Sequence, residues 1–168
     1  MMFFWILIGF IIMQRLGELV VARKNEQWML AQGGKEYGEK HYPFIVLLHS
    51  GFFFALILEV LLKGRGLIYY WPLLLAVFLF VQLTRVWVIQ SLGRFWNTKI
   101  IILPGEDLVR KGPYQWVKHP NYLIVAAEFI VVPLLFQAYT TLIVFSVLNA
   151  LFLLFIRIPK EEEALKLV

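Results

Sequence analysis

The sequence predicts an all-α, polytopic membrane protein with about five transmembrane helices. Hydrophobic residues make up 61% of the 168 residues and charged residues only 16%, which lies outside the balance of a soluble globular domain. The apolar residues gather in runs of about 20, the length that an α-helix needs to cross a bilayer. Most Lys and Arg residues lie in the polar stretches between these runs. We expect one membrane-embedded domain over residues 1–168.

The first expected span covers residues 3–22. It lacks the basic start and small-residue cleavage site of a secretory signal, so we expect it to remain as a helix. Arg15 and Glu18 lie three residues apart inside it, on one helix face, where they can pair. Two interpretations stay open: Arg15 extends toward the membrane interface, or the pair points inward to another helix or a ligand. Residues 23–42 are polar and rich in glycine, which predicts a surface connection with at most one short helix.

The second expected span covers residues 43–62 and is followed by a Lys-Gly-Arg-Gly turn at 63–66. Such a short turn predicts an antiparallel helix pair. His49 and Glu59 lie inside this span. Since no other His is at ligand spacing, we interpret His49 as a hydrogen-bonded packing residue and expect no metal site.

The third expected span covers residues 67–91, with Gln82, Arg85 and Gln90 toward its far end. A guanidinium is costly to expose to lipid, so Arg85 should face protein, a water-filled cavity or an anionic ligand. Arg85 is therefore a candidate catalytic residue.

The last two expected spans cover residues 121–136 and 138–158, with almost no loop between them. Glu128 lies in the middle of the first of these spans, and Pro133 predicts a kink near its end. Residues 92–118 contain no apolar run long enough to cross a bilayer. We expect an interfacial loop with short helices there, and a charged tail after the last span.

The Lys and Arg residues predict the orientation of the chain in the membrane. Twelve of the sixteen lie in residues 23–42, 92–118 and 157–166, and two, Lys63 and Arg65, lie on the opposite side. Basic loops stay in the cytoplasm, so we expect the N-terminus outside and the C-terminus inside. The central loop and the tail then share the cytoplasmic face.

Composition also excludes several kinds of chemistry. The sequence contains no cysteine, which removes disulfides, thiolate catalysis, iron–sulfur clusters and cysteine-based zinc sites. The net charge of +5 comes from residues beside apolar spans, where membrane lipids and topology account for it. We expect no binding of nucleic acid.

Two segments on the expected cytoplasmic face carry the residues suited to bind a cofactor. Residues 108–122 supply a Gly-Pro turn, aromatic side chains, and a His directly before a helix start with free amides. After the last span come Arg157, Glu161 and Glu162. Both signs of charge beside aromatic rings suit a zwitterionic ligand with an aromatic base, such as S-adenosylmethionine. Each residue also has a simpler interpretation, as a helix cap, an interfacial anchor or a solvated charge.

The motifs resemble the isoprenylcysteine carboxyl methyltransferase family of membrane enzymes. GPYQWVKHPNY follows LGRFWNTKI, Glu128 comes next, and RIPKEEEAL follows the last span, so that the likeness covers residues 92–165. The resemblance implies that S-adenosylmethionine binds between residues 92–122 and 157–165. Lys118 departs from the motif, because Arg is more usual at this position. The matching cofactor-binding positions are Tyr114, His119, Tyr122, Arg157, Glu161 and Glu162.

The first half of the sequence sharpens the resemblance. The order of its RLGE, KHYP and LLH segments is similar to a small bacterial branch of the family found with type III polyketide synthases. Members of that branch O-methylate alkylpyrones. The resemblance implies a bacterial plasma membrane location, a lipophilic small-molecule substrate and a type III polyketide synthase as functional partner.

The expected reaction is methyl transfer to a lipophilic acidic oxygen, an alkylpyrone enol first and a prenylcysteine-type carboxylate next. Such an oxygen is already ionised, so no strong general base is needed, and Arg85 or Arg157 can hold the anion. Three alternatives stay open. They are a phospholipid-type N-methyltransferase, an NADPH-dependent membrane reductase, and a non-catalytic scaffold or transporter that uses the intramembrane charges.

Overall fold

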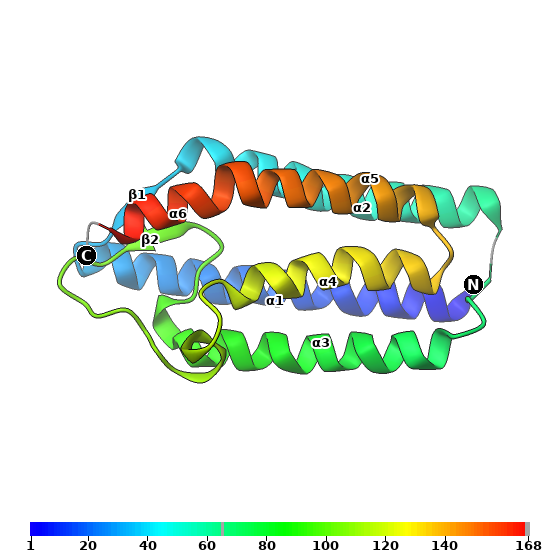
Figure 1. Cartoon of the computed structure of the whole chain (residues 1–168), viewed down its shortest axis with the longest axis horizontal. Coiled ribbons are helices and arrows are strands. Elements are labelled where there is room, and N and C mark those ends of the chain that lie inside the picture. The colour runs from blue at the N-terminus through cyan, green and yellow to red at the C-terminus, as the bar shows by residue number, and fades with distance from the viewer. Residues whose placement is uncertain (65, 167–168) are drawn as a thin grey trace.

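The computed structural model describes residues 1–64 and 66–166, and within them five long helices confirm the predicted all-α fold (Figure 1). The long helices are α1 (Met2–Ala31), α2 (Tyr42–Lys63), α3 (Trp71–Leu92), α4 (Pro120–Leu135) and α5 (Tyr139–Phe152). A π-helical turn, η4 (Leu153–Arg157), joins α5 to the short helix α6 (Ile158–Leu165). The short elements are β1 (Lys35–Tyr37), η1 (Glu39–His41), η2 (Gly93–Phe95), β2 (Ile100–Ile102) and η3 (Gly112–Gln115).

Four helical segments in the described part of the chain are long and apolar enough to cross a membrane. They are Met2–Ala31, Glu39–Lys63, Trp71–Phe95 and Tyr139–Leu165. Helix α4 is apolar but has 16 residues, below the length of a full span. Large apolar side chains point away from the bundle, for example Leu83 and Phe54, which are 71% and 70% exposed. Such a surface suits contact with lipid rather than water.

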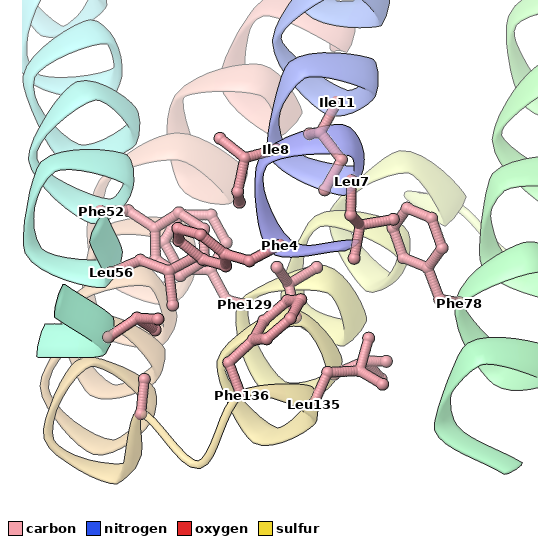
Figure 2. Close-up of a cluster of buried hydrophobic side chains, with 14 of the residues drawn as sticks. Phe4, Leu7, Ile8, Ile11, Phe52, Leu56, Phe78, Phe129, Leu135 and Phe136 are labelled. Atoms are coloured by element: carbon pink, nitrogen blue, oxygen red, sulfur yellow. The ribbon is translucent and has the colours of Figure 1, made fainter. Parts of the chain in front are cut away.

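Aromatic and aliphatic side chains fill the centre of the bundle between α1, α2, α3 and α4 (Figure 2). Phe52 of α2 stacks on Phe129 of α4 with ring centroids 4.3 Å apart, and Phe4 of α1 meets Phe136 edge to face at 4.8 Å. Leu56 is fully buried. Offset and edge-to-face ring pairs of this kind fix how neighbouring helices pack.

Helix α1 continues well past the expected end of the first span. The prediction of a surface connection over residues 23–42 was wrong for residues 23–31, which are helical. These residues are good helix formers, and Met29, which is 2% exposed, packs with Ile101 and Leu103. Gly33, at φ +88°, then turns the chain in a conformation that favours glycine.

The sequence did not indicate the small antiparallel pair of β1 and β2. Lys35 lies opposite Ile102 and Tyr37 opposite Ile100. Ile100–Ile102 was expected within an interfacial loop, although β-branched residues favour strands. The pair joins the segment after α1 to the segment after α3.

The last expected span, 138–158, also continues further than predicted, because the helical segment runs through η4 and α6 to Leu165 and takes in the expected charged tail. The boundaries of the remaining helices lie closer to the predicted ones. Helix α2 matches the expected span 43–62 to within one residue, and α3 begins four residues later than expected, with Pro72 in its first turn. Pro133 lies inside α4, near its end. Arg65, part of the predicted turn between α2 and α3, lies outside the described residues.

The elements rich in polar residues gather at one end of the bundle. Figure 1 shows β1, β2, α6 and the long connection between α3 and α4 there, beside the C-terminus, with the N-terminus at the opposite end. Helix α6 contacts both strands. The connection after α3 and the segment after α5, far apart in sequence, are thus brought together.

Candidate functional site

The backbone around residues 112–120 is shaped by glycine and proline. Gly112 adopts φ +54°, and a Cβ there would approach the Ser91 hydroxyl oxygen to 2.2 Å, so this position strongly favours glycine. Pro113 is the second residue of η3, and Pro120 is the first residue of α4, where a missing N–H costs nothing. The Gly-Pro and His-Pro motifs therefore place Tyr114 and His119 against the ends of α3 and α4.

The segment after α5 enters the site through a π-helical turn. Pro159 lacks the N–H that would bond to the carbonyl of Phe155, and the five-residue turn Leu153–Arg157 comes just before it. Single π turns inside helices are frequent at functional sites. Arg157, the last residue of the turn, is 7% exposed.

Arg157 connects the two halves of the site. Its Nε donates a hydrogen bond to the Tyr122 hydroxyl oxygen at 3.0 Å, and a terminal nitrogen donates to the carbonyl oxygen of Thr98 at 2.9 Å. One guanidinium thus joins the start of α4 and the loop after α3 to the end of η4. Two directed bonds of this kind fix the plane of the group.

Carboxylates of α6 contact the other half of the site. The Tyr122 hydroxyl donates a hydrogen bond to Glu161. His119 Nδ1 lies 3.5 Å from Glu161 Oε1, and His119 Nε2 lies 3.4 Å from Glu162 Oε1. The His119 and Tyr122 rings stack with centroids 5.4 Å apart, and Lys118 pairs with Glu162 at 2.6 Å.

The charges around His119 favour its protonated form. The hydrogen bond to Glu161 raises the pKa of His119 above its ordinary value of 6.5; burial opposes this, and Glu162 adds to it. Positive and negative groups therefore lie side by side in a partly buried site, and groups of both signs can make charge-assisted hydrogen bonds.

Tyr114 completes this group from η3. Its ring packs against Val81, Val88 and Ile124, in the angle between α3 and α4. Burial raises the pKa of the Tyr114 hydroxyl, and the negative charge of Glu161 raises it further. The phenol therefore stays protonated near neutral pH and lies within electrostatic reach of Glu161.

Arg85 lies elsewhere, in a buried ion-pair cluster between α1, α3 and α4. Its Nε and one terminal nitrogen donate to the two carboxylate oxygens of Glu18, at 2.5 and 2.7 Å, and its other terminal nitrogen donates to Glu128 at 3.2 Å. Arg15 donates hydrogen bonds to the same two carboxylates, to that of Glu18 at 2.8 Å and also to that of Glu128. The two guanidinium groups and two carboxylates balance in charge.

The structure brings together most of the predicted site residues but leaves Arg85 apart. Those that lie together are Tyr114, His119, Tyr122, Arg157, Glu161 and Glu162.

The cluster also answers the question left open for Arg15. Its guanidinium contacts Glu128 of α4, so the pair with Glu18 points inward to another helix. Gln82 joins the cluster by donating to Glu128 at 2.7 Å. Paired and hydrogen-bonded charges of this kind cost far less to bury than isolated ones.

His49 packs within the bundle as expected. Its Nδ1 is 2.9 Å from the carbonyl oxygen of Ile45, and its ring meets Phe129 edge to face at 5.3 Å. Among residues 1–64 and 66–166, no group of three or more His, Asp or Glu side chains is placed to hold a metal ion.

Two contributors to the site had no clear signal in the sequence. Thr98 acts through its backbone carbonyl, which no side-chain motif reveals. Lys118 differs from the residue more usual at this motif position, Arg, and it pairs with Glu162. A basic residue beside a motif His, on the face that also carries the acidic segment, is the signal that could have found it.

Comparison with known proteins places the sequence in a family. Residues 74–167 match the model of the isoprenylcysteine carboxyl methyltransferase (ICMT) family. The chain is 50% identical to the uncharacterized protein YpbQ of Bacillus subtilis over 163 residues, 97% of this chain and 96% of the relative. It is 30% identical to an uncharacterized protein of Haemophilus influenzae over 167 residues, 98% of this chain and 96% of the relative. No solved structure gives a significant match. The chain therefore belongs to the isoprenylcysteine carboxyl methyltransferase family.

Proposed function

We propose that the protein is an S-adenosylmethionine-dependent membrane methyltransferase that acts on a lipophilic acidic oxygen. Membership of the methyltransferase family supports the reaction class. The observation that carries the proposal is the chain of contacts from Arg157 through Tyr122 to Glu161, which joins the two sequence segments that the motifs single out. These contacts gather both signs of charge beside aromatic rings at one end of the bundle.

The residues of this site fit the chemical groups of S-adenosylmethionine. The carboxylates of Glu161 and Glu162 suit its ammonium group, and the His119 and Arg157 side chains suit its carboxylate. The Tyr114 and Tyr122 rings offer apolar faces for the base. When bound, the cofactor supplies an activated methyl group on a sulfonium; the protein residues orient it and exclude water.

The chemistry of methyl transfer suits a site at the edge of a membrane. A cationic sulfonium and an anionic oxygen combine to give neutral products, and a site with little water favours that loss of charge. An acceptor that is already ionised needs no strong general base, so positioning supplies most of the rate. We assign Arg157 to the carboxylate of the cofactor, so that its catalytic role is to position the methyl group that the acceptor's anionic oxygen attacks. Arg85 would contribute only if its ion pairs with Glu18 and Glu128 rearranged.

We favour an alkylpyrone enol as the acceptor and a prenylcysteine-type carboxylate next. The outward apolar surface supports access of such lipophilic molecules from the bilayer, and we propose membrane lipids as the surroundings of the bundle. The RLGE, KHYP and LLH segments of the first half support the alkylpyrone branch and, with it, a type III polyketide synthase as functional partner. We further propose a bacterial plasma membrane location with the cofactor site in the cytoplasm.

Equilibrium binding to the detergent-solubilised protein tests the cofactor. S-adenosylhomocysteine should bind, and His119→Ala and Glu162→Ala should each weaken binding by about tenfold, the loss expected for one charge-assisted hydrogen bond. Glu163→Ala is the matched control because Glu163 follows Glu162 in α6, has a 68% exposed side chain and pairs with Lys160. Tight NADPH binding without S-adenosylhomocysteine binding would overturn the proposal.

The acceptor is tested by methyl transfer in the same preparation. Labelled S-adenosylmethionine is incubated with long-chain alkylpyrones and, separately, with a prenylcysteine. We expect transfer to the alkylpyrone. Transfer to the prenylcysteine alone would keep the reaction class and reject the alkylpyrone branch.

A further inference from the structure

The α1 extension, residues 23–31, holds the loop that follows α3. The side-chain nitrogen of Asn25 donates hydrogen bonds to the carbonyl oxygens of Gly93 and Trp96, at 3.1 and 2.7 Å. In return, the side-chain nitrogen of Asn97 donates to the carbonyl of Ala22 at 3.2 Å. The post-α3 loop, residues 93–99, is thereby tied to α1 by bonds from both partners.

Hydrogen bonds of Lys99 hold the far end of the post-α3 loop. Lys99 Nζ donates to Glu26 at 2.7 Å and to Glu36 at 3.1 Å, and the Lys99 amide donates to the Asn97 side chain at 3.0 Å. Apolar contacts of Met29 with Ile101 lie beside these bonds. The backbone between Asn97 and Lys99 therefore has little freedom to shift relative to α1.

That backbone carries the carbonyl that orients Arg157. The carbonyl oxygen of Thr98 accepts a hydrogen bond from Arg157 at 2.9 Å, while Arg157 Nε donates to Tyr122. Tyr122 in turn donates to Glu161. If the Thr98 carbonyl moved away, the buried guanidinium would lose one of the two acceptors described for it, and its plane would no longer be fixed.

We propose that Asn25 is a positioning residue of the cofactor site and acts on Arg157 through the post-α3 loop. This inference rests on the proposed function. Asn25 lies outside residues 74–167, the part of the chain that the family model matches, so the family match does not account for it. Since small displacements of positioning groups weaken both binding and catalysis, the bonds of Asn25 to two loop carbonyls influence the site from outside it.

Binding of S-adenosylhomocysteine to the full-length protein in detergent tests this role. Asn25→Ala should weaken binding by about tenfold, and Asn97→Ala, which frees the same loop, by a similar factor. Gln27→Ala is the matched control, since Gln27 is exposed on the same extension of α1. Asn25→Ser keeps one shorter donor, so it should fall between wild type and Asn25→Ala and serves if the alanine variant folds poorly.

A double-mutant cycle separates positioning from a general loss of stability. In an Arg157→Lys background, Asn25→Ala should weaken binding by less than about twofold, because the group that it orients is already changed. A full tenfold effect in that background, or equal binding by wild type and Asn25→Ala, would overturn the inference. A loss in only one of the two Asn variants would also contradict a role through the shared loop. Absence of binding by wild type would instead overturn the proposed function and this inference with it.

Discussion

His119 gives the site a pH-dependent contribution to folding. Its pKa is raised in the folded protein, chiefly by the hydrogen bond to Glu161 and further by Glu162. A group with a raised folded pKa stabilises the protein fully below its unfolded pKa, which lies near 6.5, and loses that effect as pH rises through the folded pKa. We therefore expect the difference in melting temperature between wild type and His119→Gln to be largest near pH 6 and to shrink above neutral pH. A difference that grows with pH would contradict the interaction with Glu161.

Glu128 balances the charges of the buried cluster, so its removal should destabilise the bundle strongly. Glu128→Gln leaves Arg15 and Arg85 to share the single carboxylate of Glu18. Breaking a buried ion pair by removing one partner costs about 3–5 kcal/mol. We expect a loss of that size in unfolding of the detergent-solubilised protein, against no measurable loss for Glu163→Gln at an exposed position. A small loss in Glu128→Gln would mean that the cluster is more hydrated than its burial suggests.

The limits of sequence reasoning appear most clearly at single residues. The motifs indicated Tyr122, Arg157 and Glu161, and the distribution of basic residues placed their two segments on one face. The Thr98 carbonyl could not be predicted, because a backbone acceptor leaves no trace in side-chain patterns. The sequence predicts that Arg85 faces protein, a water-filled cavity or an anionic ligand, and in the structure it faces Glu18 and Glu128 of other helices. Hydropathy alone cannot distinguish these partners.

At the scale of elements, long apolar helices were predictable and short polar ones were not. The expected span 43–62 and helix α2 agree because about twenty apolar residues can only cross as a helix. The α1 extension beyond residue 22 was missed because its hydropathy resembles that of a loop, while its helical state depends on packing of Met29 against residues after α3. The β1–β2 pair joins segments more than sixty residues apart, and no local pattern reports such a contact.

Helix α5 depends on α2 for its N-terminal cap. The carboxylate of Glu59, which is 8% exposed, accepts hydrogen bonds from the Thr140 amide at 3.1 Å and from the Thr141 amide and hydroxyl at 2.7 and 2.8 Å. These are the amides that a helix start leaves without partners. Glu59→Ala should cost about 2 kcal/mol of stability, the upper range for loss of a cap.

Thr141→Val is the informative comparison for this cap. It removes only the hydroxyl contact to Glu59 and should cost about 1 kcal/mol, less than the loss of the whole carboxylate. Thermal unfolding of Glu59→Ala and Thr141→Val in the same detergent shows which variant loses more stability. Equal losses would show that the hydroxyl, and not the amides, carries the effect.

At the scale of the whole molecule, the grouping of polar elements at one end agrees with the count of basic residues. The connection 32–41, the loop after α3 and α6 all lie at the end opposite the N-terminus (Figure 1). Together with the α1 extension, Arg157 and Lys166, these segments carry twelve of the sixteen Lys and Arg residues. Because basic loops remain in the cytoplasm, this end should face the cytoplasm, where soluble S-adenosylmethionine is available.

The absence of cysteine from the sequence makes this orientation directly testable. Tyr69→Cys places one thiol in the connection between α2 and α3, at an 86% exposed position, and Glu163→Cys places one in α6 at the other end of the bundle. In intact bacterial spheroplasts, a membrane-impermeant maleimide should label Tyr69→Cys at once and Glu163→Cys only after permeabilisation. The reverse pattern would move the cofactor site to the outer face, where the cell supplies no S-adenosylmethionine, and would contradict the proposed function. Labelling of both variants in intact spheroplasts would indicate leaky cells or mixed topology. A known cytoplasmic protein shows whether the reagent enters the cells, and the cysteine-free parent shows the background labelling.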